Sequence, residues 1–176
     1  APHSVLLMNI NKVTVIGAGT MGAGIAMCLL GSGLQVYLLE INPENLDRGL
    51  SYIRDTLASS VKKGRITEQQ SISQLLRLTA TTKYAAIADS HVVIEAAFES
   101  MAVKQDIFAK LDKTLSADCI LASNTSYLNI DEIASVVKHK ERVIGLHFFS
   151  PAHIMKLLEI VKTKHVESNV VASCMA

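Results

Sequence analysis

Short apolar runs alternate with amphipathic stretches along most of this chain. Runs dominated by Val, Ile and Leu are typical of strands buried on both faces, whereas apolar residues three or four positions apart are typical of helices. The pattern predicts strands at residues 12–16, 35–39, 78–81, 91–96, 119–123, 142–147 and 157–161. It predicts helices at residues 20–32, 43–63, 67–76, 101–111 and 131–138.

This alternation predicts a Rossmann-like, doubly wound α/β domain with a mostly parallel sheet covered by helices on both faces. Only residues 148–156 separate the last two predicted strands. That is short for a crossover helix, so we expect an antiparallel edge pair at the C-terminal end. Residues 1–11 are expected to be a linker or N-terminal extension and residues 12–176 the domain. The chain starts at Ala1 and stops within a predicted helix, so we expect a part of a longer protein.

The composition supports one folded domain and excludes several classes of protein. The 176 residues are 49% apolar and 19% charged, which is too hydrophobic for a disordered chain. The formal net charge is +1, so we expect no basic surface for nucleic acid. No apolar run reaches the roughly 18 residues that a membrane-spanning helix needs, so we expect no membrane span.

The cysteines and histidines do not predict a metal site or a disulfide framework. Cys28, Cys119 and Cys174 are far apart and odd in number. They are typical of small buried residues in a reducing compartment. His147 and His153 lack further ligands at the spacing of zinc sites.

A glycine-rich turn follows the first predicted strand and opens the first predicted helix. Gly17, Gly19 and Gly22 fit the pattern G-x-G-x-x-G of dinucleotide-binding units. In such a unit the first glycine permits the tight turn, the second lets the backbone approach a pyrophosphate, and the third lets the helix pack on the strand. The helix N-terminus at Thr20 and Met21 would offer amides and a positive dipole end to the phosphates.

An acidic residue, Glu40, follows the second predicted strand at close to the expected spacing of about 20 residues from the turn. Its carboxylate can accept hydrogen bonds from ribose hydroxyls and would repel a 2′-phosphate, and no Arg immediately follows it. These features favour NAD over NADP. The alternative is a glycine-rich turn that binds no ligand. However, the predicted strand, turn, helix, second strand and acid follow one another at the spacing of a dinucleotide-binding unit.

Polar residues follow two further predicted strands, at the sheet edge where doubly wound folds bind ligands. Glu99 and Lys104 follow the strand at 91–96, and Asn124, Thr125 and Ser126 follow the strand at 119–123. Each also has a simpler explanation. Glu99 suits a helix N-terminus, Lys104 suits a solvated surface, and residues 124–126 suit an ordinary turn.

His147 and Glu159 would face each other if the last two predicted strands formed a hairpin. Glu159 lies in an apolar run, where a buried carboxylate is costly unless it is paired. A histidine partner would be held in one tautomer, with its other nitrogen free to act as a base. The pair is either structural or catalytic, and a neighbouring dinucleotide site favours catalysis.

Four segments carry a resemblance to a known family: KVTVIGAGTMGAGIA at residues 12–26, ASNTS at 122–126, HFFSPAH at 147–153 and LLEIV at 157–161. Together they resemble the NAD-binding domain of L-3-hydroxyacyl-CoA dehydrogenase, over nearly everything from Lys12 onward. The Ser-Pro-Ala-His version after HFF is most similar to the dehydrogenase part of peroxisomal-type multifunctional β-oxidation enzymes. Many family members have Asn where this chain has Ser150, so the cofactor contact of that Asn is not carried over.

The resemblance implies roles for the matching residues. His147 would take the hydroxyl proton while hydride leaves C3 of the substrate, Glu159 would orient His147, and Ser126 would bond near the substrate oxygen and the nicotinamide. Thr56 and Lys63 on the long second helix would contact CoA, although Lys62 and Lys63 equally suit a solvated helix face. The cofactor-contacting positions would be Gly17, Gly19, Thr20, Met21, Gly22, Glu40, Glu99, Lys104, Asn124 and Ser126.

The resemblance also implies NAD-dependent oxidation of a (3S)-3-hydroxyacyl-CoA to the 3-ketoacyl-CoA in fatty acid β-oxidation. The family has a following helical domain that completes the acyl-CoA pocket, and we expect it beyond residue 176, with weak or no activity in this domain alone. A preceding enoyl-CoA hydratase domain, a homodimer and a peroxisomal location are further expectations, with mitochondrion or cytoplasm as other locations. The alternatives are an NAD-binding module without catalysis and a dehydrogenase of a related hydroxy acid without CoA.

Overall fold

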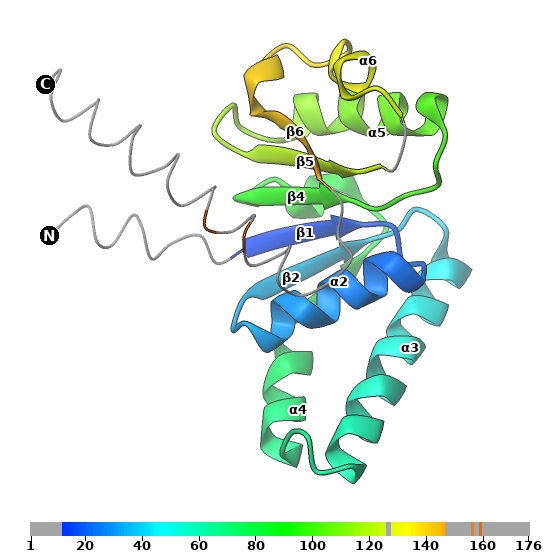
Figure 1. Cartoon of the computed structure of the whole chain (residues 1–176), viewed down its shortest axis with the longest axis vertical. Helices are drawn as coiled ribbons and strands as arrows, with labels where there is room; N and C mark the ends of the chain where they lie inside the picture. The colour runs from blue at the N-terminus through cyan, green and yellow to red at the C-terminus, as the bar shows by residue number, and fades with distance from the viewer. Residues whose placement is uncertain (1–11, 126–127, 147–155, 157–158, 160–176) are drawn as a thin grey trace, which may run out of the picture.

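Parallel strands form one six-stranded sheet in the computed structural model, which describes residues 12–125, 128–146, 156 and 159 (Figure 1). The strand order reverses between two central neighbours, which marks the point where doubly wound folds bind ligands, at the carboxyl ends of the strands. The predicted Rossmann-like, doubly wound fold is therefore confirmed. In spatial order the strands are β3 (Leu78–Thr81), β2 (Gln35–Leu39), β1 (Lys12–Ile16), β4 (Val92–Glu95), β5 (Ile120–Asn124) and β6 (Val143–Leu146).

Helices cover both faces of this sheet because successive side chains of each strand point to opposite faces. Val13 and Val15 of β1 belong to the core cluster under α2 (Thr20–Gly31) and α3 (Pro43–Lys62). Ile16 of the same strand belongs to a second cluster on the other face. That cluster is covered by α5 (Met101–Thr114) and α6 (Ile130–Ala134).

A helical pair extends away from the sheet, formed by α3 and α4 (Glu68–Leu76) (Figure 1). The Asn42 side chain caps α3 by accepting from the amides of Glu44 and Asn45. Thr67 and Gln70 form a reciprocal capping box at the start of α4. None of the described helices combines the length and the hydrophobicity that a bilayer-spanning segment needs.

Among the residues that the structure describes, the predicted antiparallel edge pair is not seen. β6 pairs in parallel with β5, and the backbone is helical at Lys156 and at Glu159. The prediction of a strand at residues 157–161 is therefore wrong at Glu159. The local sequence Lys-Leu-Leu-Glu consists of residues that favour helices, whereas a strand gains its stability from a partner. Two short 3-10 helices, η1 (Tyr84–Ile87) and η2 (Lys140–Arg142), were not predicted.

We predict that Gly49→Ala lowers the free energy of unfolding. A Cβ at Gly49 would lie 2.6 Å from the carbonyl oxygen of Ala18, so α3 would have to move away from the turn that follows β1. Overpacking typically costs about 1–3 kcal/mol. That exceeds the roughly 1 kcal/mol by which Ala favours a helix over Gly. Urea denaturation measures the change.

Gly31→Ala is the matched control, because a Cβ at the end of α2 would meet open space. This variant should keep or raise the stability of the wild type. Equal stabilities of the two variants would contradict close packing of α3 on the turn.

Candidate functional site

A cleft of about 990 Å³ lies at the carboxyl ends of β1, β2 and β4, beside the point where the strand order reverses. Its volume is in the range of small-molecule and cofactor sites. Part of its wall comes from the helices α3 and α5, and part comes from three segments: the turn after β1 with the start of α2, the segment after β2 and the segment after β4. These three segments contribute Gly17, Ala18, Gly19, Thr20, Met21, Glu40, Ile41, Ala96, Ala97 and Phe98.

Two of the three motif glycines are required by the packing of the protein itself. Gly17 has a φ of +104°, and a Cβ there would lie 2.7 Å from the carbonyl oxygen of Ala96. A Cβ at Gly22 would lie 1.8 Å from the carbonyl oxygen of Gly17, so any side chain would push α2 off the turn. These contacts explain the tight turn and the close approach of helix and strand that the motif predicted.

Gly19 differs, because nothing in the described protein demands a glycine there. Its φ of −73° and ψ of −174° are open to any residue, and a Cβ would have no heavy atom within 4 Å. Gly19 faces the cleft and is the N-cap of α2, whose first turn holds no acidic residue. The free space and the positive helix end fit the phosphates of a dinucleotide. Thr20 and Met21 of this first turn are exposed and line the same cleft.

Glu40 joins the glycine turn to the start of α3. Its Oε1 accepts from the Ala18 amide at 3.3 Å, and its Oε2 accepts from the Asn42 amide at 3.1 Å. Glu40 is partly exposed to the cleft, so the carboxylate can still accept hydrogen bonds from a ribose. The structure also brings Arg48 into this cleft, where its Nη2 donates to Asn45 Oδ1 at 2.9 Å. Arg48 was not predicted, because it lies eight residues after Glu40 in the sequence and reaches the cleft from α3.

Tyr84 from η1 forms another part of the cleft wall that sequence analysis missed. Burial raises the pKa of its hydroxyl to about 12, and the negative charges of Asp106, Glu40 and Glu95 act in the same direction. The Lys110 ammonium lies 5.6 Å from the centre of the ring. At neutral pH Tyr84 is therefore an uncharged hydrogen-bonding group in the wall of the cleft.

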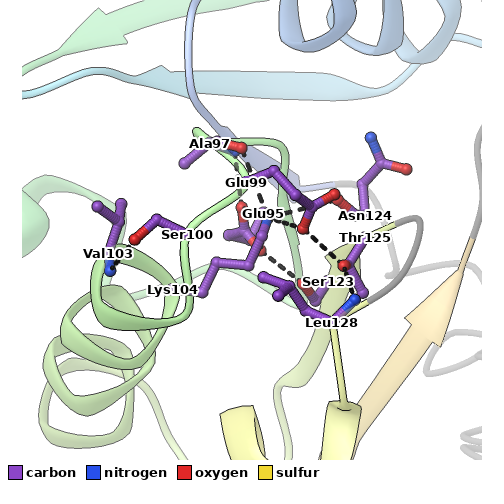
Figure 2. A network of polar contacts seen from close by, with 10 residues as sticks. All are labelled: Glu95, Ala97, Glu99, Ser100, Val103, Lys104, Ser123, Asn124, Thr125 and Leu128. Atoms are coloured by element: carbon purple, nitrogen blue, oxygen red, sulfur yellow. Dashed lines mark hydrogen bonds and ion pairs between the residues drawn. The ribbon is translucent and has the colours of Figure 1, made fainter.

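Lys104 is fully buried, so its interpretation as a solvated surface residue is wrong. Its ammonium lies 2.7 Å from the carboxylate of Glu95, which is also fully buried (Figure 2). Glu99, with a quarter of its side chain exposed, lies 3.8 Å from the same ammonium. Its Oε1 accepts from the Thr125 hydroxyl at 2.6 Å. Lys104, Glu99 and Asn124 are thus brought together behind the cleft wall, and direct contact with a cofactor stays a prediction for them.

The remaining predicted site residues divide into two groups. His147 and Ser126 lie outside the described residues, and Glu159 is exposed on a helical backbone. Thr56 is partly buried on α3, and Lys63 is exposed and caps the end of this helix that is remote from the sheet (Figure 1). Within the described ranges, no group of three or more His, Cys, Asp or Glu residues could hold a metal ion.

Comparison with known proteins shows which family and which relatives this chain is similar to. The family described as "3-hydroxyacyl-CoA dehydrogenase, NAD binding domain" matches residues 12–176. The glyoxysomal fatty acid beta-oxidation multifunctional protein MFP-a of Brassica napus is 42% identical over 166 residues, which are 94% of this chain and 23% of that protein. The 3-hydroxyadipyl-CoA dehydrogenase of Escherichia coli is 43% identical over 89% of this chain and 33% of that protein. The chain spans less than a quarter of the plant multifunctional relatives that it matches.

Solved structures share the fold. FadB2 of M. tuberculosis has a TM-score of 0.77 and 40% identity, over 80% of this chain and 50% of that chain. The 3-hydroxybutyryl-CoA dehydrogenase of Escherichia coli K12 has a TM-score of 0.78 and 43% identity, over 82% of this chain and 30% of that chain.

We predict that Tyr84 makes the domain lose stability at alkaline pH. Because its pKa is about 12 in the folded protein and near 10 when unfolded, the stabilisation is complete below pH 10. It is lost as the pH rises from about 10 through about 12. Urea denaturation at pH 9 and pH 11 should show a steeper loss for the wild type than for Tyr84→Phe. Equal losses of stability in the two proteins would show that burial does not raise the pKa of this hydroxyl.

Proposed function

This chain belongs to the family of the 3-hydroxyacyl-CoA dehydrogenase NAD-binding domain, and from that premise we propose that the protein carrying it oxidises (3S)-3-hydroxyacyl-CoA to 3-ketoacyl-CoA in fatty acid β-oxidation. The observation that carries the proposal is the open, cleft-facing Gly19 at the positive end of α2. Neither packing nor backbone conformation explains a glycine there, whereas close approach of a pyrophosphate does.

The described residues bind and orient the cofactor. The amides at the start of α2 hold the phosphates, and Glu40 accepts hydrogen bonds from the adenosine ribose. Ala96, Ala97 and Phe98 bound the cleft on the side of β4, beside the strand-order reversal, and would contact the bound cofactor there. NAD, when bound, supplies the hydride acceptor.

The proton transfer is assigned to residues carried over from the family motifs. The C3–H bond of the substrate breaks as hydride leaves, a carbonyl forms, and the proton of the hydroxyl passes to His147. Glu159 orients His147 and compensates its positive charge, and Ser126 donates to the substrate oxygen. Thr56 and Lys63 contact CoA from α3. A positioned base of this kind typically contributes about 10²–10⁴-fold to the rate.

The arrangement of the whole protein is also part of the proposal. A following helical domain completes the acyl-CoA pocket and forms a homodimer, an enoyl-CoA hydratase domain precedes this chain, and the protein acts in peroxisomes. The chain covers less than a quarter of the plant relatives, which supports further domains in the whole protein. The names of these relatives as peroxisomal or glyoxysomal multifunctional proteins support the location. The sequences that flank the chain test the domain order, and microscopy of the tagged protein tests the location.

Gly19→Ala should separate cofactor binding from stability. We expect the unfolding free energy to change by no more than about 1 kcal/mol, because the new methyl group meets no protein atom and only the preference for glycine over alanine at an N-cap is lost. The Kd for NADH should rise at least about tenfold, because the methyl group keeps the phosphates from the amides. NADH fluorescence titration and urea denaturation measure the two quantities.

Gly24→Ala is the control, since its Cβ also meets open space in α2 but lies outside the cleft. It should bind NADH as the wild type does. Equal NADH affinities of the two variants would show that the phosphates do not bind at Gly19.

His147→Gln in the full-length protein should leave NADH binding near normal and lower turnover of acetoacetyl-CoA by at least about 10²-fold. The physical reason is the loss of the proton acceptor while the cofactor cleft stays intact. Steady-state assays with acetoacetyl-CoA and NADH measure the effect. Unchanged turnover would show that His147 takes no part in the mechanism. A faster reaction with free 3-hydroxybutyrate than with its CoA ester would show that an acyl-CoA is not the substrate.

A further inference from the structure

The carboxylate of Glu95, at the end of β4, has both oxygens engaged inside the protein. Oε1 accepts from Lys104 Nζ at 2.9 Å and from the Ser123 hydroxyl at 2.6 Å. Oε2 accepts from Lys104 Nζ at 2.7 Å and from the Ala97 amide at 2.6 Å. No residue of this set except Lys104 belongs to the predicted site, and the glycine motif does not require Glu95.

The partners of Glu95 come from three separate segments (Figure 2). Ala97 lies in the loop after β4, Lys104 is on α5, and Ser123 is near the end of β5. The Lys104 ammonium also donates to the carbonyl oxygens of Ala97 at 3.5 Å and of Asn124 at 3.4 Å. One buried ion pair therefore ties the ends of two neighbouring strands to one helix.

The backbone that Glu95 holds is also a wall of the cofactor cleft. Ala96 and Ala97 line the cleft. The Ala97 amide nitrogen would lie 3.2 Å from a Cβ at Gly17, and the Ala96 carbonyl oxygen would lie closer still. A shift of a few tenths of an ångström in this loop would therefore move the surface on which the glycine turn rests.

Stability alone is a weak explanation for such a pair. Removing two charges from water costs free energy, and well-packed apolar residues often replace a buried pair without loss of stability. What apolar residues cannot supply is directional bonding to one amide, one hydroxyl and two carbonyl oxygens. The directional contacts fix the positions of the loop after β4 and of Asn124, which precedes the family-motif residue Ser126 by two positions.

Resting on the proposed function, we propose that Glu95 is a positioning residue of the dehydrogenase site. It acts through Lys104 and Ser123 and through the Ala97 amide, and it holds the loop after β4 against the glycine turn so that the cleft keeps the width that the cofactor needs. Glu95 does not touch the cofactor itself.

Glu95→Gln in the full-length protein tests this role, because it keeps the shape and removes the charge. The Kd for NADH should rise about tenfold, the order expected when the anchoring hydrogen bonds weaken. NADH fluorescence titration at a temperature where circular dichroism shows a folded protein measures this effect. Wild-type affinity in Glu95→Gln would overturn the proposal.

Asp112→Asn is the matched control for a structural effect. Asp112 lies on the same helix as Lys104 and accepts from the buried Arg142 at 3.0 Å, and neither residue lines the cleft. This variant should lose stability and keep its NADH affinity within about twofold. Equal loss of affinity in Asp112→Asn and Glu95→Gln would reduce the role of Glu95 to general stability and overturn the proposal.

Two further variants keep the test decisive. Glu95→Gln combined with Lys104→Met removes the uncompensated ammonium and should regain stability while NADH binding stays weak. Recovery of binding together with stability would overturn the proposal.

Ser123→Ala replaces Glu95→Gln as the test if Glu95→Gln does not fold. It removes one hydrogen bond to Oε1 and should weaken NADH binding about threefold. Unchanged NADH binding would overturn the proposal.

The binding readout separates this proposal from the proposed function. A wild type that binds NADH but does not turn over acetoacetyl-CoA would contradict the dehydrogenase function and leave the comparison of NADH affinities valid. A wild type that does not bind NADH would overturn both.

Discussion

The close approach of three backbone segments is the constraint on which the rest of this structure depends. Gly17 rests on the carbonyl group of Ala96, and Gly22 rests on Gly17 itself, at distances that no side chain would allow. These contacts bring α2 down onto the ends of β1 and β4. The amides at the start of α2 therefore point at the cleft, and the loop after β4 becomes its opposite wall.

Much of the fold was predictable because its signals are local. Thr67 and Gln70 form the capping box that their spacing indicates, and Pro43 is the first residue of α3. The apolar runs of β1, β2 and β3 end where the sequence pattern ends them. The predicted edge pair depended instead on contacts distant in sequence. The segment around Glu159 favours a helix locally, and apolar spacing alone does not show whether a strand partner is available.

The candidate site was predictable only where a sequence motif, or an acidic residue at a known distance from it, indicated the site. Glu40 was found from its distance to the glycine turn, whereas Arg48 and Tyr84 reach the cleft through tertiary packing that spacing does not reveal. Glu95 could have been found. A carboxylate within an apolar strand drew attention to Glu159, and the same criterion applies to Glu95 in the run from Val92 to Glu95. Its partner Lys104 looked like a surface residue because helix position alone does not show burial.

The strand order also has a consequence for synthesis of the chain. β1 lies at the centre of the sheet, where Val13 pairs with Val36 on one side and with Val92 on the other. A ribosome adds roughly 5–20 residues per second. One hydrogen-bonding edge of β1 therefore stays open for several seconds after its other neighbour has emerged. During that interval the nascent chain presents one unpaired edge of an apolar strand, which is a state that chaperones protect from aggregation.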